Sequence, residues 1–119
     1  MDERTAIDYC LALPGAWPDT PFSPDLVAAK IGQGRGRIFA HLGQTGIAVK
    51  CGRSREETDA WLARYPEQAR VMPYDGRFGW NSLDYTIPED ELIEAIRDSY
   101  RYAAAALPRA QRPEGYDAV

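Results

Sequence analysis

The chain of 119 residues is poor in cysteine and histidine and has no long apolar run. Its two cysteines, Cys10 and Cys51, stand at apolar positions inside predicted regular elements, where a thiol usually serves as a small core side chain. The one histidine, His41, has no cysteine or carboxylate at ligand spacing, which excludes a histidine-rich metal site. Because no apolar run approaches the ~18 residues that cross a bilayer, we expect a cytoplasmic protein without a membrane partner.

The sequence also lacks the arrangements that mark an active site. It has no Gly-x-Ser-x-Gly elbow, and neither thiol stands in a nucleophile signature. Gly32, Gly34 and Gly36 resemble a dinucleotide-binding loop, but such a loop precedes a helix, and here a strand follows. The acidic residues of 89–98 suit the positive end of a helix dipole better than a Ca²⁺ site. We therefore expect a protein that is not an enzyme and that uses no metal or cofactor.

Charge is distributed unevenly along the chain. The formal net charge is −4, yet residues 30–77 contain nine basic and five acidic side chains, whereas residues 84–98 contain one basic and six acidic ones. A local positive surface can therefore exist on a protein of negative total charge. The alternative is an ordinary solvated surface, and the sequence leaves both open.

The first third of the chain predicts a helix, a rigid connector and the start of a sheet. Residues 3–13 have apolar side chains at helical spacing, and Pro14-Gly15 ends the helix. Three further prolines up to residue 24 predict an extended connector, because proline fixes its own φ and keeps the preceding residue out of the helical region.

Three runs that follow predict an antiparallel meander over residues 26–31, 37–42 and 47–51. Short glycine-rich loops separate them, as in β-hairpins. In the middle run, alternation predicts that Phe39 and His41 lie on the face opposite Leu42.

The second half predicts two more helices and a second hairpin. Ser54 to Glu57 match a capping box that starts a helix ending at Pro66. Residues 70–74 and 78–85 predict a hairpin around the turn Asp75-Gly76, and Pro88 starts a long amphipathic helix. Together these elements define a single α+β domain over residues 1–108, with a five-stranded antiparallel sheet and three helices. We expect residues 109–119 to form a loose tail.

Basic residues alternate with apolar ones on the predicted strands and hairpin loops, and an aromatic-amide pair follows them. Cations in this arrangement can contact phosphates, and Trp80 and Asn81 could stack on a base or hydrogen-bond to its edge. The alternative for Trp80 is a core aromatic, and for Asn81 a structural hydrogen bond. The candidate nucleic-acid contacts are Lys30, Arg35, Arg37, Lys50, Arg53, Arg77, Trp80 and Asn81.

Several short motifs, in this order and spacing, resemble the MmcQ/YjbR family of small bacterial proteins. They are Leu13-Pro14-Gly15-Ala16, Asp19, Pro21-Phe22, Val49-Lys50-Cys51, Arg64-Tyr65-Pro66, Trp80-Asn81-Ser82-Leu83, Ile87 to Leu92, Asp98-Ser99-Tyr100 and Leu107-Pro108. The resemblance implies a frataxin-like α+β fold and DNA binding through a double wing of hairpins. This functional implication is an association with a fold and not a derivation from a site.

Two functions remain open from the sequence. The first is a non-enzymatic DNA-binding module that holds phosphates with its basic hairpins. The second is a protein-interaction or small-ligand domain in which Trp17, Phe22, Trp61 and Trp80 line a groove between sheet and helices. In either case we expect a monomer or weak dimer.

Overall fold

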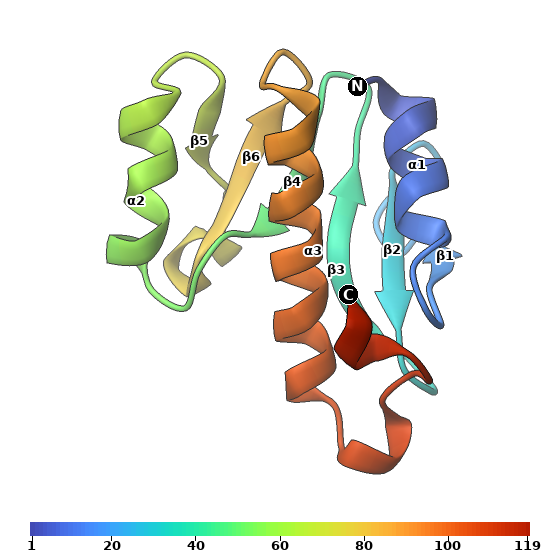
Figure 1. Ribbon diagram of the computed structural model, residues 1–119. Helices are drawn as coiled ribbons and strands as arrows, with labels where there is room; N and C mark the ends of the chain where they lie inside the picture. The colour runs from blue at the N-terminus through green and yellow to red at the C-terminus, as the bar shows by residue number, and fades with distance from the viewer.

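The computed structural model describes residues 1–119 and has an open antiparallel sheet with three α-helices (Figure 1). The strands follow the spatial order β1-β2-β3-β4-β6-β5, and every neighbouring pair is antiparallel. The elements are α1 (Glu3–Leu11), β1 (Trp17–Asp19), β2 (Val27–Ile31), β3 (Arg37–Leu42), β4 (Gly46–Lys50), α2 (Arg55–Arg64), β5 (Ala69–Val71), the 3₁₀ turn η1 (Asp75–Phe78), β6 (Trp80–Asp84), α3 (Glu89–Ala106), and the 3₁₀ turns η2 (Arg109–Gln111) and η3 (Tyr116–Ala118). The predicted α+β class and antiparallel sheet are confirmed.

The sheet has six strands and not the predicted five, because part of the proline-rich connector pairs with β2. Trp17 lies opposite Lys30, and Asp19 lies opposite Ala28. Pro18 is tolerated because β1 is an edge strand, where a missing N–H breaks no ladder on the solvent side.

The connection between β5 and β6 is not the predicted two-residue turn at Asp75-Gly76. These residues begin the 3₁₀ turn η1, and the whole segment from Met72 to Gly79 joins the two strands. Pro73 has no N–H to continue the ladder, and Tyr74 adopts a positive φ of 66°. The strands therefore separate earlier than the sequence pattern predicts.

Helices α1 and α3 cover one face of the sheet, and α2 lies beside β5 (Figure 1). The predicted apolar stripe of α3 is buried in the core, where Tyr100 meets Phe39 edge-on at 5.3 Å between ring centroids. This contact corrects the predicted orientation of Phe39. A β-bulge shifts the register between Ala29 and Lys30, so Phe39 turns toward the helices while His41 keeps the opposite face.

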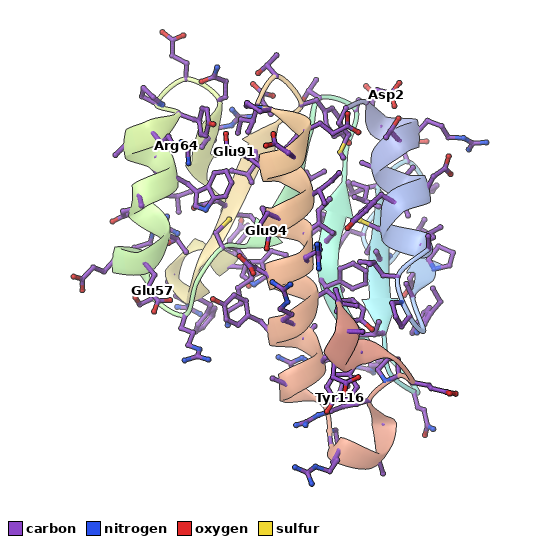
Figure 2. All side chains as sticks on the ribbon, in the orientation of Figure 1. Asp2, Glu57, Arg64, Glu91, Glu94 and Tyr116 are labelled. Atoms are coloured by element: carbon purple, nitrogen blue, oxygen red, sulfur yellow. The ribbon has the colours of Figure 1, made fainter.

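The C-terminal segment 109–119 packs against the domain and is not the predicted loose tail. Tyr116 and Val119 lie against the hydrophobic core, and Arg101 Nε donates to the backbone oxygen of Val119 at 2.7 Å. Tyr116 sits beside the lower half of α3 in Figure 2. The Tyr116 side chain fixes the segment to the core. The sequence of the segment has no apolar periodicity, so this contact could not be predicted from the pattern.

A polar pair connects α2 to the start of α3. Arg64 Nη1 lies 2.7 Å from Glu91 Oε1, and Tyr65 donates its hydroxyl to the same carboxylate (Figure 2).

None of the helices is both long and apolar enough for a bilayer crossing.

Candidate functional site

The sheet face away from α1 and α3 carries the side chains of chemical interest. Strand register aligns His41, Ala48, Ser82 and Arg70 in one row across β3, β4, β6 and β5. Side chains alternate along a strand, so this row lies on the face opposite the core residues that flank it. Ala48 and Ser82 have small side chains, whereas His41 and Arg70 at the two ends of the row have large ones. The surface of the sheet is therefore concave in the middle of the row.

Strands β3 and β4 diverge beyond His41, and a side chain of α3 fills the gap in their hydrogen bonding. The two strands pair only at His41–Ala48 and Leu42–Ile47. Farther along, Ser99 Oγ donates to Phe39 O at 2.6 Å and accepts from Lys50 N at 3.0 Å. The hydroxyl thus satisfies two backbone groups that would otherwise pair directly, and the sheet opens there.

A cleft of about 380 Å³ occupies this opening. We call it the cationic cleft, and its floor is α3. Its lining residues are Arg37, Ile38, Lys50, Asp75, Phe78, Trp80, Ser99, Tyr102, Ala103 and Ala106. Five of the predicted contacts lie in or beside it. Arg37, Lys50 and Trp80 line it, Arg77 stacks on Phe78 at 4.7 Å, and Arg53 stacks on Tyr102.

Aromatic rings, and not carboxylates, contact three of the cations around this cleft, namely Lys50, Arg53 and Arg77. Lys50 Nζ lies 5.6 Å from the Tyr102 ring centroid, and the Arg53 guanidinium lies 5.9 Å from the same ring. Neither side chain forms a salt bridge, nor do Arg37 and Arg77. Cation–π contacts orient a cation without neutralising its charge. The positive charge here therefore stays available to an anion.

Three of the predicted contacts, Arg35, Lys30 and Asn81, lie outside the cationic cleft. Arg35 is exposed in the β2–β3 loop and does not line it. Lys30 is 7% exposed, with its ammonium 2.7 Å from Asp19 Oδ2 and 2.8 Å from the Arg35 carbonyl oxygen. The hydrogen bond from the Lys30 ammonium lowers the pKa of the Asp19 carboxyl. The pair already neutralises Lys30, which is not free for a phosphate.

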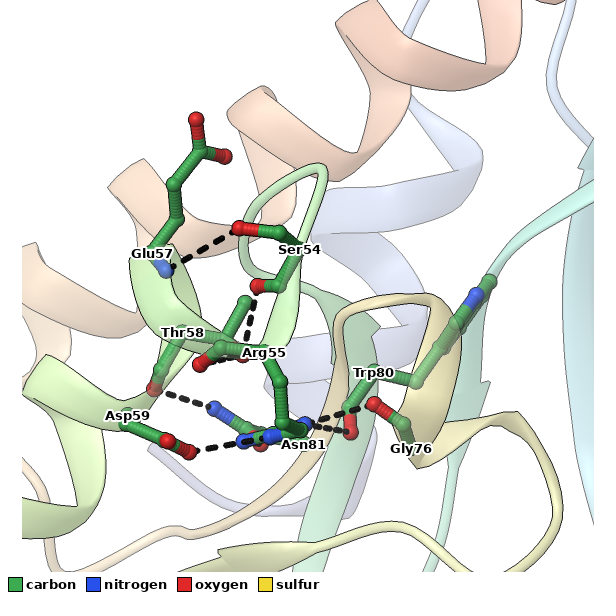
Figure 3. Close-up of polar contacts among 8 residues, drawn as sticks. All are labelled: Ser54, Arg55, Glu57, Thr58, Asp59, Gly76, Trp80 and Asn81. Carbon is green, nitrogen blue, oxygen red and sulfur yellow. Dashed lines mark hydrogen bonds and ion pairs between the residues drawn. The ribbon is translucent and has the colours of Figure 1, made fainter.

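Asn81 is fully buried and serves the fold, which corrects its prediction as a base contact. Its Oδ1 accepts from Arg55 Nη2 at 2.7 Å, and its Nδ2 donates to Thr58 O at 3.1 Å (Figure 3). Arg55 also donates to Gly76 O at 2.7 Å and pairs with Asp59 at 2.9 Å. The network connects α2, β6 and η1, and so supports the wall of the cleft that contains Trp80 and Phe78.

Sequence reasoning missed Arg55, although its position carried a weak signal. Arg55 directly follows the N-cap Ser54, whose hydroxyl accepts from Glu57 N at 3.3 Å (Figure 3). A basic residue at the first helical position opposes the helix dipole, which indicates that another interaction retains it there.

A second and larger hollow of about 530 Å³ lies next to the cationic cleft on the same face. We call it the apolar pocket. Its lining residues are Phe22, Leu26, His41, Gly43, Thr45, Gly46, Ile47, Ala48, Arg70, Met72, Pro73, Tyr74, Asp75, Ser82 and Leu83. Asp75 borders both hollows, and the His41 ring lies 5.6 Å from the Trp80 ring.

The predicted aromatic groove between sheet and helices is not assembled. Phe22 lines the apolar pocket and Trp80 the cationic cleft. Trp17 instead donates its indole N–H to Gly32 O at 3.0 Å, and Trp61 packs against Tyr65. The four side chains thus lie in four different places.

The two thiols are poor candidates for nucleophiles. Burial raises the pKa of both Cys10 and Cys51 to about 12. Since the thiolate is the reactive form, both are almost fully protonated at neutral pH.

The architecture defines a class of protein: a small α+β domain whose open antiparallel sheet is covered by helices on one face and hollowed on the other. The chain belongs to the YjbR family, whose family model matches residues 11–102. This confirms the resemblance drawn from the sequence motifs.

Solved structures support the fold. Protein DR2400 of Deinococcus radiodurans, with a domain of the DUF419 family, is 18% identical; the match covers 92% of this chain and 83% of that one, with a TM-score of 0.78. A protein from Pseudomonas syringae is 15% identical, with 87% of this chain and 99% of that one covered and a TM-score of 0.68. The chain has no match among curated proteins.

Proposed function

We propose that this protein is a non-enzymatic nucleic-acid-binding module that holds DNA phosphates at the cationic cleft. The phosphate contacts are Arg37, Lys50, Arg53 and Arg77, with Arg35 at the neighbouring loop. The observation that carries the proposal is the gathering of cations without salt bridges around one cleft, supported by aromatic rings.

The charge pattern of the chain is compatible with this partner. The net charge of −4 repels DNA from most of the surface, whereas a local cluster of cations attracts it to one face. In the lining of the cationic cleft, Asp75 is the one carboxylate. Binding is therefore directed to the open end of the β3–β4 gap, between the β2–β3 and β5–β6 connections that act as the wings.

Salt dependence gives the proposal a magnitude. About four phosphate contacts correspond to a slope of about −3.6 for log K against log salt on duplex DNA, or roughly a hundredfold loss of affinity between about 50 and 200 mM salt. Each removed contact should lower the magnitude of this slope by about 0.9.

The test is a titration of labelled duplex and single-stranded DNA, followed by fluorescence anisotropy at two salt concentrations. The variant Arg37→Ala removes an exposed cation of the cleft. Its matched control is Arg4→Ala, because Arg4 is also exposed and lies on α1, which covers the other face of the sheet. We expect weaker binding and a smaller slope for Arg37→Ala and an unchanged slope for Arg4→Ala. No binding at low salt, or an equal loss in both variants, would refute the proposal.

A further inference from the structure

The apolar pocket contains a buried polar group that the protein itself leaves without a partner. His41 is 7% exposed and its side chain makes no hydrogen bond, and its Nδ1 is the one buried side-chain nitrogen or oxygen in the protein that lacks a partner. Such groups are rare in native structures, because an unmade hydrogen bond inside a protein is costly. The imidazole therefore has unused hydrogen-bonding capacity at the edge of a cavity.

Aromatic rings flank this imidazole. The Phe22 ring centroid lies 5.7 Å from that of His41, and the Trp80 centroid lies 5.6 Å from it. Phe22 is 72% exposed and is one of four large hydrophobic side chains that the fold leaves exposed. The surface around His41 is thus apolar and partly exposed to solvent, as is typical of a site for a flat ligand.

Tyr74, which also borders the apolar pocket, has a strained backbone conformation. It is the only non-glycine residue with positive φ, at φ 66° and ψ −57°, and Asp75 N donates to Pro73 O across it at 2.7 Å. This is the rare γ-turn geometry, and strain of this kind concentrates at ligand-binding positions. The turn leaves the Tyr74 side chain 94% exposed beside the pocket.

The charges at the rim select an uncharged ligand. Arg70 and Asp75 supply one cation and one anion, and the other polar side chains of the lining are His41, Thr45, Tyr74 and Ser82. A neutral imidazole offers one donor and one acceptor, and burial lowers the pKa of His41 and so favours this neutral form. The ligand that fits is flat, uncharged in the ring and supplied with both donors and acceptors.

We propose that the apolar pocket binds a planar nitrogen heterocycle of the nucleobase class, stacked on the exposed ring of Tyr74 and hydrogen-bonded to His41. The inference rests on the proposed function for one possible source of the ring, an unpaired base of a strand whose phosphates lie in the adjacent cationic cleft. The other source is a free nucleoside.

The single histidine makes the test direct. Adenosine, guanosine, cytidine and thymidine are titrated separately into the protein, and the His41 ring signals are followed by NMR. We expect a saturable shift of these signals with at least one nucleoside. A single-stranded oligonucleotide and its abasic counterpart are then titrated in the same way to distinguish the two sources. If the base-containing strand shifts the His41 signals at lower concentration than the nucleoside and the abasic strand do, the ligand is a base of a strand. If the strand binds no more tightly than the nucleoside, the ligand is a free nucleoside. No saturable shift with any nucleoside or with the strand would overturn the proposal.

Variants at Tyr74 separate stacking from a structural effect. Tyr74→Ala should weaken binding roughly fivefold to a hundredfold, the range expected for loss of one base–aromatic stack, while Tyr74→Phe should keep it. Both side chains are exposed at this position, so urea unfolding should show the two variants equally folded. Equal weakening in both variants, or in neither, contradicts the proposed stacking.

The two proposals can fail separately. Arg37→Ala should leave nucleoside binding unchanged, because a nucleoside has no phosphate to contact the cationic cleft. DNA binding without any nucleoside or strand-dependent shift of His41 overturns only the base pocket. Nucleoside binding without salt-dependent DNA binding overturns only the proposed function.

Discussion

Replacing Arg55 by alanine should destabilise the domain far more than replacing its basic neighbour Arg53. Arg55 provides the one hydrogen bond to the fully buried Oδ1 of Asn81, at 2.7 Å. A buried acceptor that loses its donor costs about 1–3 kcal/mol, and a hydrogen bond from a charged group contributes about 1.5–3 kcal/mol.

The other contacts of Arg55 add less. Gly76 O also accepts from Gly79 N, so it keeps one partner when the guanidinium is removed. The pair with Asp59 is partly exposed and contributes at most about 1 kcal/mol. We therefore expect Arg55→Ala to lower the free energy of unfolding by about 3 kcal/mol, a large part of the about 5–15 kcal/mol typical of such domains.

Urea denaturation followed by tryptophan fluorescence measures this change. With an m-value of about 1.5 kcal/mol per M, the midpoint should fall by about 2 M. Arg55→Met, which keeps most of the side-chain volume, should be nearly as unstable, because the missing hydrogen bonds dominate. Arg53→Ala, two residues earlier and exposed, should change stability by less than about 0.5 kcal/mol. If Arg55→Ala costs under about 1 kcal/mol, the reasoning about Asn81 is wrong.

Two further predictions concern the sheet. Ser99→Ala removes the hydroxyl that joins Phe39 O to Lys50 N. It should lower the free energy of unfolding in urea by about 2 kcal/mol and speed hydrogen exchange of the Lys50 amide. An unchanged exchange rate would count against this role of the hydroxyl. Burial lowers the pKa of His41 while Asp75 partly opposes this, so the unfolded chain binds the proton more readily. The contribution of His41 to stability should be constant above pH about 6.5 and fall below it, by up to about 1.4 kcal/mol per pH unit until the lowered pKa is passed. His41→Phe should lack this step, and an identical pH profile for both proteins would show that His41 does not cause it.

Much of the helical structure could be predicted because its signals are local. Pro14 follows the first helix, Ser54 caps the second, and Pro88 precedes the third. Each signal acts through a neighbouring backbone group, so its effect does not depend on the rest of the fold. The strands of the meander followed equally from alternation and glycine-rich loops.

The candidate site could be predicted only in part. Arg37, Lys50 and Trp80 were expected as contacts from residue type, and they meet at one cleft because β3 and β4 diverge. No residue near Lys50 in the sequence indicates that β3 and β4 separate there, because the separation depends on Ser99 from α3. Asn81 was misread because a buried amide and an exposed one have the same sequence pattern.

The amino-acid order by itself determined where the helices begin and end, which runs form the strands of the meander, and the family to which the chain belongs. Tertiary structure alone decided that the proline-rich connector becomes an edge strand, that a bulge turns Phe39 inward, and that His41 is left unpartnered beside a pocket. The physical reason is range: caps and alternation act between neighbouring residues, whereas pairing register, burial and cavities arise from contacts between segments far apart in the chain.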